Sequence, residues 1–203
     1  MSIATDAEIQ ALLKVVDPAD NATGGGTASA VAGALAAGLA GMVARVSSGR
    51  PGMESSTYYE EIDTAARRLA RALLAGGLGD SEAFGRVMEA YRLPKETPED
   101  KERRSRAIQA GLEAATAVPL DNGERCAEVL DLVDRLTPKH NTNATSDLEV
   151  GRRLAVAALE GCIDNVEINL GSLKDESVRN NFEVRLNTLR SVAASVGRGG
   201  AHV

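Results

Sequence analysis

The chain has 203 residues, of which 43% are hydrophobic but only 2% aromatic, and its formal net charge is −6. It is therefore long enough to bury one sizeable core, which Ala, Leu, Val and Gly must fill, and such small side chains favour closely packed helices. The acidic balance argues against a nucleic-acid partner, which requires a basic footprint, and against binding to an anionic membrane surface.

Hydrophobic residues recur at helical spacing along the chain, and no segment shows the sustained alternation expected of a strand. In chain order, we predict helices over residues 6–16, 27–48, 58–78, 81–92, 97–116, 122–136 and 146–173, and then an amphipathic helix from Val178 to Val196. Short loops join these segments. The sequence thus predicts an all-α fold, a single-domain helical bundle of seven or eight helices spanning residues 1–203.

The predicted helix boundaries depend on glycine, proline and capping residues. The glycine-rich stretch 76–79 is expected to end the third helix, and Asp80 is expected to act as the N-cap of the fourth. Pro119 is expected to separate the fifth and sixth helices. The stretch Ser146–Glu149 matches a capping box at the start of the seventh helix.

The stretch Thr27–Ala44 carries no charge, so its length raises the question of membrane insertion. Ala and Gly dominate it and contribute little transfer free energy, so we expect a buried helix rather than a membrane span. Gly33, Ala37 and Gly41 recur every four residues along it. This stripe of small residues allows another helix to approach closely, as in the centre of a bundle or at a dimer seam.

The N-terminus lacks the charged-then-apolar pattern of a signal peptide, so we expect a cytoplasmic protein. Cys126 and Cys162 have no CxxC partner and lie among apolar helical neighbours, which favours buried, reduced thiols. Only two histidines are present, so no metal site is expected. His140, in a predicted loop, is interpreted as a surface side chain.

The glycine run Gly24–Gly26 opens the most apolar helix. Backbone N–H groups at such a start can bind an anion or a polar ligand, helped by the helix dipole. The run lacks both the G-x-G-x-x-G spacing of dinucleotide sites and the lysine of a P-loop. From spacing alone, a tight turn is modestly favoured over a binding site.

Two charged residues are further candidates for chemistry. Asp80 is a carboxylate at a predicted helix entry, where it can cap the helix, shuttle a proton, or do both. Lys95 follows the turn Leu93–Pro94, where it can meet a negative group or donate a proton. Capping for Asp80 and simple solvation for Lys95 are the favoured interpretations from sequence alone.

The seventh predicted helix carries Asp147, Asn165 and Asn169 near one stripe. Asp147 and Asn165 are 18 residues apart, which is five turns or roughly 27 Å along the axis, so they cannot hold one reacting atom within one subunit. Asn165 and Asn169 are one turn apart among apolar residues, and a buried asparagine is costly unless hydrogen-bonded. Two roles are equally compatible with this asparagine pair: hydrogen bonds that tie neighbouring helices together, or binding of a ligand.

Taken together, these motifs resemble the cyclodeaminase/cyclohydrolase family. That family includes the cyclodeaminase half of formiminotransferase-cyclodeaminase and the stand-alone methenyltetrahydrofolate cyclohydrolases. The family usually has proline where this chain has Thr23, and commonly serine where it has Thr27. The resemblance covers nearly the whole chain and is carried, in order, by Gly24–Thr27 running into Ala28–Val43, then 80–84, 90–95, 107–110, 118–120, Ser146–Asp147 and 165–170.

The resemblance implies an all-helical homodimer that acts on a tetrahydrofolate one-carbon adduct, without a metal or redox cofactor. The first expectation is a methenyltetrahydrofolate cyclohydrolase, which forms 10-formyltetrahydrofolate. The alternative is a 5-formiminotetrahydrofolate cyclodeaminase, which releases ammonia. A third interpretation, outside the enzymes, is a folate-binding or assembly protein that catalyses no reaction.

The resemblance also implies roles for the candidate residues. Asp80 and Asp147 are the carboxylates expected to act as base or pterin anchor. Lys95 is expected to act as an acid or to contact the glutamate tail of folate. The expected substrate-binding residues are Gly24, Gly25, Gly26 and Thr27, with backbone donors, and Asn165 and Asn169, with side-chain amides.

Overall fold

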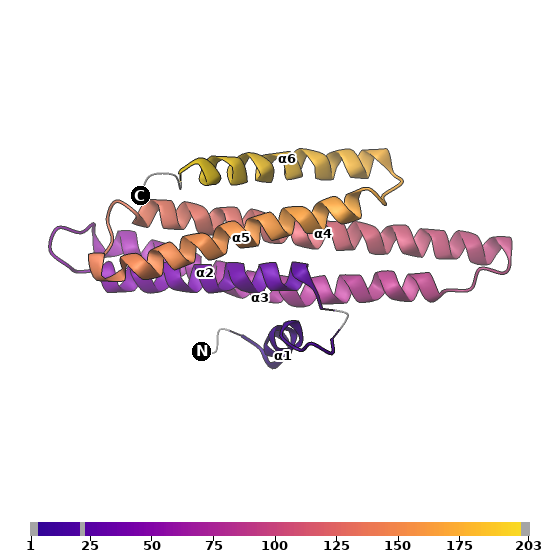
Figure 1. Ribbon diagram of the computed structural model, residues 1–203, viewed down its shortest axis with the longest axis horizontal. Helices are drawn as coiled ribbons and strands as arrows, with labels where there is room; N and C mark the ends of the chain where they lie inside the picture. The colour runs from indigo at the N-terminus through magenta and orange to yellow at the C-terminus, as the bar shows by residue number, and fades with distance from the viewer. Residues whose placement is uncertain (1–3, 21–22, 200–203) are drawn as a thin grey trace.

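The computed structural model describes residues 4–20 and 23–199, and every regular element in these ranges is helical. Four helices, α2 to α5, form a bundle, and α1 and α6 flank it (Figure 1). The all-α prediction is therefore confirmed. In chain order the elements are α1 (Asp6–Val15), α2 (Gly25–Ser47), α3 (Ser56–Arg92), α4 (Pro98–Leu136), the 3₁₀ turn η1 (Thr142–Ala144), α5 (Thr145–Leu170) and α6 (Glu176–Gly199).

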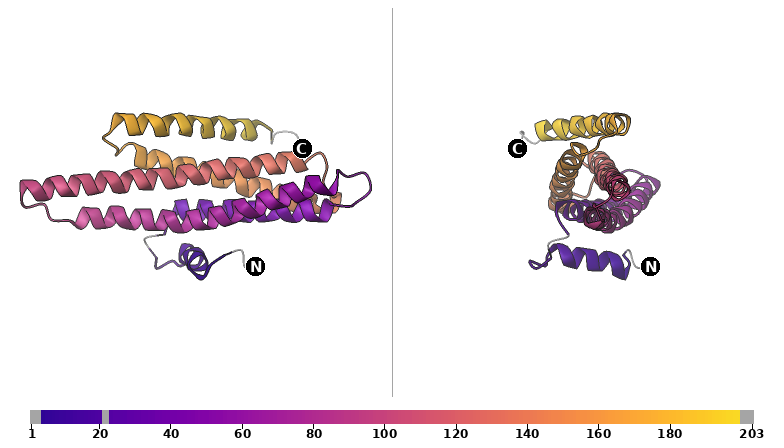
Figure 2. Two further views of the ribbon diagram at one scale, coloured as in Figure 1. Left: turned by 180° about the vertical axis from the view of Figure 1, so that it is seen from behind. Right: turned by 90° about the vertical axis from the view of Figure 1, so that its right-hand side faces the viewer.

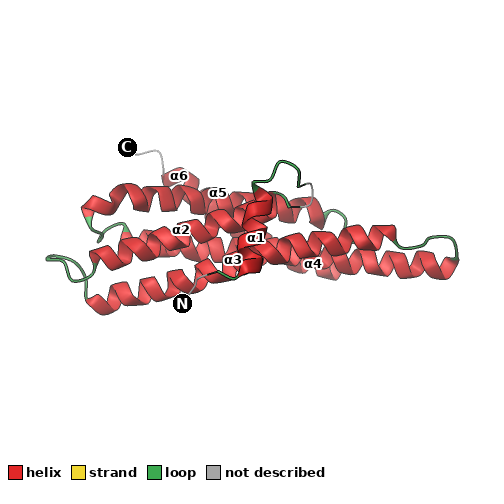
Figure 3. Cartoon of the chain, turned by 90° about the horizontal axis from the view of Figure 1, so that it is seen from below, coloured by secondary structure: helices red, strands yellow, loops and turns green. Residues whose placement is uncertain are grey.

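The bundle is long because α3 and α4 form an extended hairpin that projects beyond α2 and α5 at one end (Figures 1 and 2). The flanking helices lie on opposite sides: α6 packs on α4 and α5, and α1 crosses over α2 and α3 (Figures 2 and 3). The α2–α3 and α3–α4 loops lie at opposite ends of the bundle (Figure 3). Buried side chains of all four bundle helices belong to one hydrophobic core.

Helix α2 is the central element, in contact with α3, α4 and α5. Its inward positions are mostly alanine and glycine, and Ala30, Ala37 and Ala40 are fully buried. By length and hydropathy α2 is a candidate membrane span, but 67% of its most apolar window is buried inside the bundle. A core helix passes the same test, and the packing of α2 on three neighbours is that of a core helix.

The structure has six α-helices in the described residues, so the predicted seven or eight is wrong. One cause lies in α3, which continues through the glycines of 76–79, so Asp80 is not the N-cap of a new helix. Each interior glycine costs about 1 kcal/mol relative to alanine. Close packing favours glycine at position 76, because a Cβ there would collide with the Asn122 side chain.

The second cause lies in α4, which continues through Pro119. Proline has no N–H, so the carbonyl of Ala115, four residues earlier, loses its helical partner. The Asn169 side chain of α5 supplies the missing donor, because its Nδ2 lies 2.8 Å from the Ala115 oxygen. The break expected at Pro119 is therefore repaired from a neighbouring helix.

The helix starts were predicted with mixed success. The prediction for Thr97 and Pro98 is confirmed: Thr97 Oγ1 accepts from Asp100 N at 3.1 Å, and Pro98 takes the first helical position. The capping box at Ser146–Glu149 is wrong, since α5 begins at Thr145 with no side-chain cap. The turn η1 leads directly into α5, so the chain is already helical where a cap was expected.

Candidate active site

The first turn of α2 lies against α3 at Asp80. Gly24 is the N-cap residue of α2 and makes no side-chain capping bond, while Gly25 and Gly26 form the first helical positions. A Cβ at Gly26 would collide with the Asp80 carboxylate. The close approach of a charged side chain therefore favours glycine at position 26.

Thr27 binds the Asp80 carboxylate from α2. Its buried hydroxyl lies 3.1 Å from Asp80 Oδ2 and 3.1 Å from the Gly77 carbonyl oxygen, and its backbone N–H also bonds to Asp80. Asp80 thus binds the N-terminus of a helix, as its sequence position suggested, but the helix is α2 rather than its own. A carboxylate at a helix N-terminus is stabilised by the helix dipole.

Burial raises the pKa of Asp80 above its ordinary value of 3.8, and the hydrogen bonds from the Thr27 hydroxyl and N–H partly oppose that rise. A carboxylate with a raised pKa is a stronger base and releases its proton closer to neutral pH. Asp80 therefore has the environment expected of a group that exchanges protons with a ligand.

Asn165 brings α5 to the same place. Its Nδ2 would lie 3.5 Å from a Cβ on Gly25, and it donates to the Gly161 carbonyl oxygen at 2.7 Å. Ser29 also lies where α2 meets α5: its hydroxyl donates to the Gly25 carbonyl oxygen within α2 at 2.7 Å and occupies the space beside Gly161 of α5. The glycine run, Asp80 and Asn165, which are far apart in sequence, therefore meet at the start of α2.

Asn169 is one turn farther along α5 and is used differently. Its Nδ2 is engaged by the Ala115 oxygen that Pro119 leaves without a partner. For Asn169 the structure therefore favours the helix-tying interpretation.

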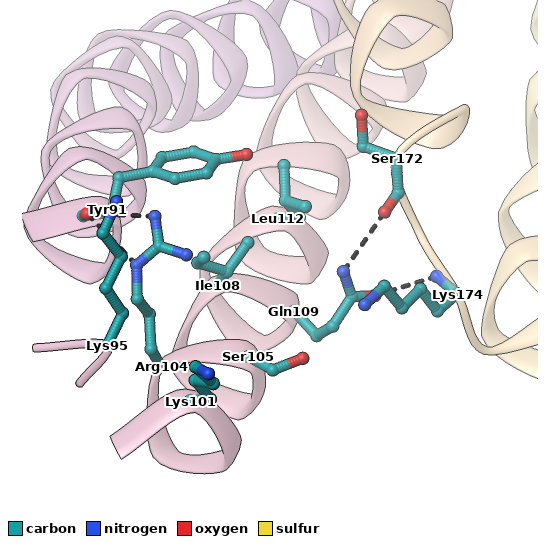
Figure 4. A pocket seen from close by; sticks show the side chains of 10 residues that line it. All are labelled: Tyr91, Lys95, Lys101, Arg104, Ser105, Ile108, Gln109, Leu112, Ser172 and Lys174. Atoms are coloured by element: carbon teal, nitrogen blue, oxygen red, sulfur yellow. Dashed lines mark hydrogen bonds between the residues drawn. The ribbon is translucent and has the colours of Figure 1, made fainter. Parts of the chain in front are cut away.

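Lys95 lies outside this cluster and lines a pocket of about 420 Å³. Arg104 lies beside the Tyr91 ring (Figure 4), with its Cζ 5.6 Å from the ring centroid, and its guanidinium donates to the backbone carbonyl oxygen of Tyr91. Gln109 bridges to the loop after α5, donating to the backbone carbonyl oxygen of Ser172 and accepting from the backbone N–H of Lys174. With Lys95, Lys101 and Lys174, Arg104 gives the pocket four cationic side chains.

The two regions are separated along the helices. Asp80 and Arg92 are 12 residues apart in α3, or about 18 Å along its axis, and Lys95 lies beyond that helix. Asp147 is farther away still: it lies in the first turn of α5, roughly 27 Å from Asn165 on the same continuous helix. Within one chain, the structure does not bring Lys95 or Asp147 to Asp80.

His140 lies at the Asp147 end of α5. Its Nδ1 is 3.0 Å from the Thr137 oxygen, and its Nε2 is 2.8 Å from Thr145 Oγ1. Both ring nitrogens therefore bond locally, at the opposite end of α5 from Asn165.

Comparisons with known proteins identify the family of the chain. A family model described as formiminotransferase-cyclodeaminase matches residues 8–188, which is most of the chain. The chain belongs to the formiminotransferase-cyclodeaminase family. The resemblance noted in the sequence is thereby confirmed.

Individual members of the family differ in length. Methenyltetrahydrofolate cyclohydrolase of Methylorubrum extorquens is 37% identical over 175 residues, covering 86% of this chain and 83% of that protein. Formimidoyltransferase-cyclodeaminase of Rattus norvegicus is 31% identical over 191 residues, or 91% of this chain. The chain spans only 34% of the length of the rat protein.

A solved member of the family has the same fold. The crystal structure of formiminotetrahydrofolate cyclodeaminase from Thermotoga maritima superposes with a TM-score of 0.78 at 26% identity. The match covers 95% of this chain and 91% of that chain.

One departure from the family pattern has a structural consequence. Thr23 stands where the family usually has proline, and its N–H donates to Asp20 Oδ1 at 2.8 Å. Proline has no N–H and cannot make that bond. In this chain the Thr23 N–H therefore makes a hydrogen bond that proline at this position would exclude.

Sequence reasoning correctly expected two buried free thiols, since Cys126 and Cys162 are both fully buried. A hydrogen bond with Cys126 and burial raise the pKa of Cys162, so this thiol stays protonated.

Sequence reasoning missed Asn122, which is fully buried beside Gly76. The available signal was an asparagine on the apolar face of α4, one turn before Cys126.

Proposed function

We propose that the chain is a methenyltetrahydrofolate cyclohydrolase, which converts 5,10-methenyltetrahydrofolate to 10-formyltetrahydrofolate. The observation that carries this proposal is the Asp80 carboxylate, whose pKa is raised by burial, held against Gly26 at the N-terminus of α2. The Methylorubrum extorquens relative, aligned over most of both chains, is named for this reaction.

In this mechanism Asp80 transfers protons to and from the bridge between two folate nitrogens. Water adds its oxygen to the methenyl carbon, and Asp80 accepts one water proton, which gives a neutral tetrahedral carbinolamine. The bond from that carbon to N5 then breaks, and N5 keeps the electron pair and takes the proton from Asp80. The remaining hydroxyl proton leaves to solvent as the formyl C=O forms on N10, so one proton is released in total.

The rest of the site orients the substrate for this step. The free N–H groups of Gly24–Gly26, with the positive end of the α2 dipole, suit the polar edge of a pterin or an oxygen that gains negative charge. Asn165 lies beside Gly25 and offers its side-chain oxygen as an acceptor for ring N–H groups. Neither addition of water nor expulsion of N5 requires a metal or a redox cofactor.

The cationic pocket of Lys95, Lys101, Arg104 and Lys174 is proposed to bind the glutamate carboxylates of the substrate. It lies farther along the same helices than Asp80 and Asn165. From Asp80 to Tyr91, α3 advances about 16 Å, which suits a ligand whose pterin and glutamate are at opposite ends. Lys95 is therefore assigned a binding role rather than the role of an acid at the reacting carbon.

The second candidate function is that of a 5-formiminotetrahydrofolate cyclodeaminase. The Thermotoga maritima structure, which aligns over nearly the whole chain, is named for this activity. There, N10 attacks the formimino carbon, the tetrahedral carbon expels ammonia, and Asp80 would carry the same proton. Both reactions pass through a carbon flanked by nitrogens, so the same residues serve either one.

An absorbance assay distinguishes the two functions. A cyclohydrolase removes the methenyltetrahydrofolate chromophore when that compound is supplied. A cyclodeaminase makes the chromophore appear when 5-formiminotetrahydrofolate is supplied, with release of ammonia. If the folded protein binds folate but turns over neither substrate, the proposal of catalysis is wrong and the chain is a folate-binding protein.

We also propose that the chain forms a homodimer in the cytoplasm. An apolar groove of about 470 Å³ is lined by Leu12 of α1, Leu35 and Leu39 of α2, Leu74 of α3 and Leu154 of α5. Leu35 is 57% exposed at this groove, although α2 is otherwise a core helix. A dimer is also the arrangement in which Asp147, remote from Asp80 within one chain, can contribute to a site in a second copy.

A further inference from the structure

Several polar side chains inside the bundle sit where a facing glycine leaves room. Asp80 occupies the space beside Gly26, and Ser29 occupies the space beside Gly161. Asn122 of α4 is placed in the same way, because a Cβ on Gly76 of α3 would lie 2.7 Å from its Cγ. The three glycines leave room for these polar side chains in an interior that is otherwise apolar.

Asn122 differs from the other members of this set in its hydrogen bonding. Ser29 donates to Gly25, and Asp80 accepts from Thr27. Asn122 is fully buried, and its Oδ1 accepts from Arg125 Nη1 at 3.0 Å. Its Nδ2, however, has no hydrogen-bond partner among the described residues. Buried amide groups are normally hydrogen-bonded to protein or to ordered water. We therefore expect Asn122 Nδ2 to donate to an acceptor beyond the hydrogen bonds given above.

Asp80 is a functional acceptor on the same face of α3 as Gly76. Gly76 and Asp80 are one turn apart on α3, and helical side chains lean toward the preceding turn. The Thr27 hydroxyl contacts both the Gly77 carbonyl oxygen and Asp80 Oδ2, so the carboxylate lies beside the turn from Gly77 to Asp80. Asn122 approaches α3 at Gly76 from α4, while Thr27 approaches it from α2.

We propose that Asn122 is a positioning residue for Asp80: its Nδ2 donates through one buried water to the Asp80 carboxylate. The receiving oxygen is Oδ1, because the Thr27 hydroxyl takes Oδ2. A bridging water suits this place because buried waters make about three hydrogen bonds to polar groups. The bond from Arg125 to Asn122 Oδ1 polarises the amide and strengthens its donor.

This water-mediated bond stabilises the charged form of Asp80 and so opposes the effect of burial. The titratable groups involved come from two other helices. The thiol of Cys162 faces Asp80 from α5, and α4 contributes Cys126 and, beyond Asn122, the Arg125 guanidinium. Thr27, the facing residue of α2, carries no charge. The catalytic consequence of the proposal rests on the proposed function, but its effect on the protonation of Asp80 does not.

A carboxyl-carbon NMR titration tests the proposal without any substrate. The Asp80 signal is assigned by its loss in Asp80→Asn. Asn122→Leu, which keeps the side-chain volume, is expected to raise the pKa of Asp80 by about one unit. Arg125→Met is expected to raise it less. Thr27→Val, which removes a direct hydrogen bond, is the positive control and is expected to raise it as well.

Thr116→Val is the matched negative control. Thr116 is fully buried in the same helix as Asn122, but its hydroxyl bonds to Leu112 within that helix. If Asn122→Leu does not fold, Gly76→Ala serves in its place, since the new Cβ displaces the Asn122 side chain. An unchanged or lowered pKa of Asp80 in the folded variant, while Thr27→Val shifts it, overturns the proposal. A chain inactive on folate leaves this titration fully readable, so failure of the two proposals is distinguishable.

Discussion

Asp80 lies in a buried environment that disfavours the charged form of its carboxylate. Burial raises its pKa, while Thr27 and the N-terminus of α2 partly restore the stability of the carboxylate. A buried carboxylate of this kind lowers the stability of the folded protein at neutral pH, but its raised pKa allows it to exchange a proton with a ligand. Trade-offs of this kind are common where function requires a strained or desolvated residue.

The stability of Asp80→Asn relative to the wild type should therefore depend on pH. The folded pKa is raised above the unfolded value of 3.8, so the folded wild type binds the extra proton between those two pKa values. Its stability falls as pH rises through that window, and the cost stays constant above it. The variant has no such cost, so its relative free energy of unfolding should be higher at about pH 7 than at about pH 4.

Denaturant unfolding of both proteins at several pH values measures this difference. Glu82→Gln, an exposed carboxylate two residues away on α3, is the control and should show no comparable trend. A relative stability of Asp80→Asn that declines as pH rises would contradict the raised pKa.

At the scale of single elements, the continuity of α4 depends on a side chain from another helix. Pro119 removes the donor for the Ala115 oxygen, and Asn169 replaces it. Asn169→Leu should leave that carbonyl unpaired and lower the free energy of unfolding by about 1–3 kcal/mol. In a Pro119→Ala background the helix regains its own N–H, so the same substitution should cost clearly less.

A double-mutant cycle measured by denaturant unfolding isolates this coupling. Asn165→Leu, one turn away on the same helix, gives a matched comparison, because its partner Gly161 is unaffected by Pro119. Additive effects of Pro119→Ala and Asn169→Leu would mean that the contact does not repair the helix.

The element scale also shows why parts of the fold could not be predicted from the sequence. Helix existence and type were predictable, because the apolar periodicity is strong and the start at Thr97–Pro98 is a local signal. The continuity of α3 and α4 was not predictable, because the glycines of 76–79 and Pro119 normally interrupt a helix when they are judged from local sequence alone. Both helices continue because of partners distant in sequence, such as Asn122 and Asn169.

The candidate site shows the same limit. The sequence suggested that Asp80 binds a helix start, but only the fold shows that the helix is α2. A helix break was expected at Gly76. It was therefore not predictable from the sequence that Gly76 leaves room for the Asn122 side chain. The meeting of Gly25, Gly26, Asp80 and Asn165 depends on how three helices pack, which no local pattern encodes.

At the scale of the whole molecule, the apolar groove around Leu35 tests the proposed homodimer. The wild type should elute with twice the chain mass in light scattering coupled to size exclusion. Leu35→Glu should shift it toward the monomer, since it places a charge in an apolar contact. Val184→Glu is the control, because Val184 is an exposed apolar residue on α6, away from the groove. A monomeric wild type would contradict the proposal.

The central claim is that Asp80, held at the start of α2, transfers the proton during methenyltetrahydrofolate hydrolysis. The most direct measurement is the rate at which the methenyltetrahydrofolate chromophore is lost with wild type, Asp80→Asn and the control Glu82→Gln. We predict rapid loss with wild type and Glu82→Gln, and a rate for folded Asp80→Asn that is lower by about 100-fold or more. Turnover by folded Asp80→Asn at the wild-type rate would contradict the claim.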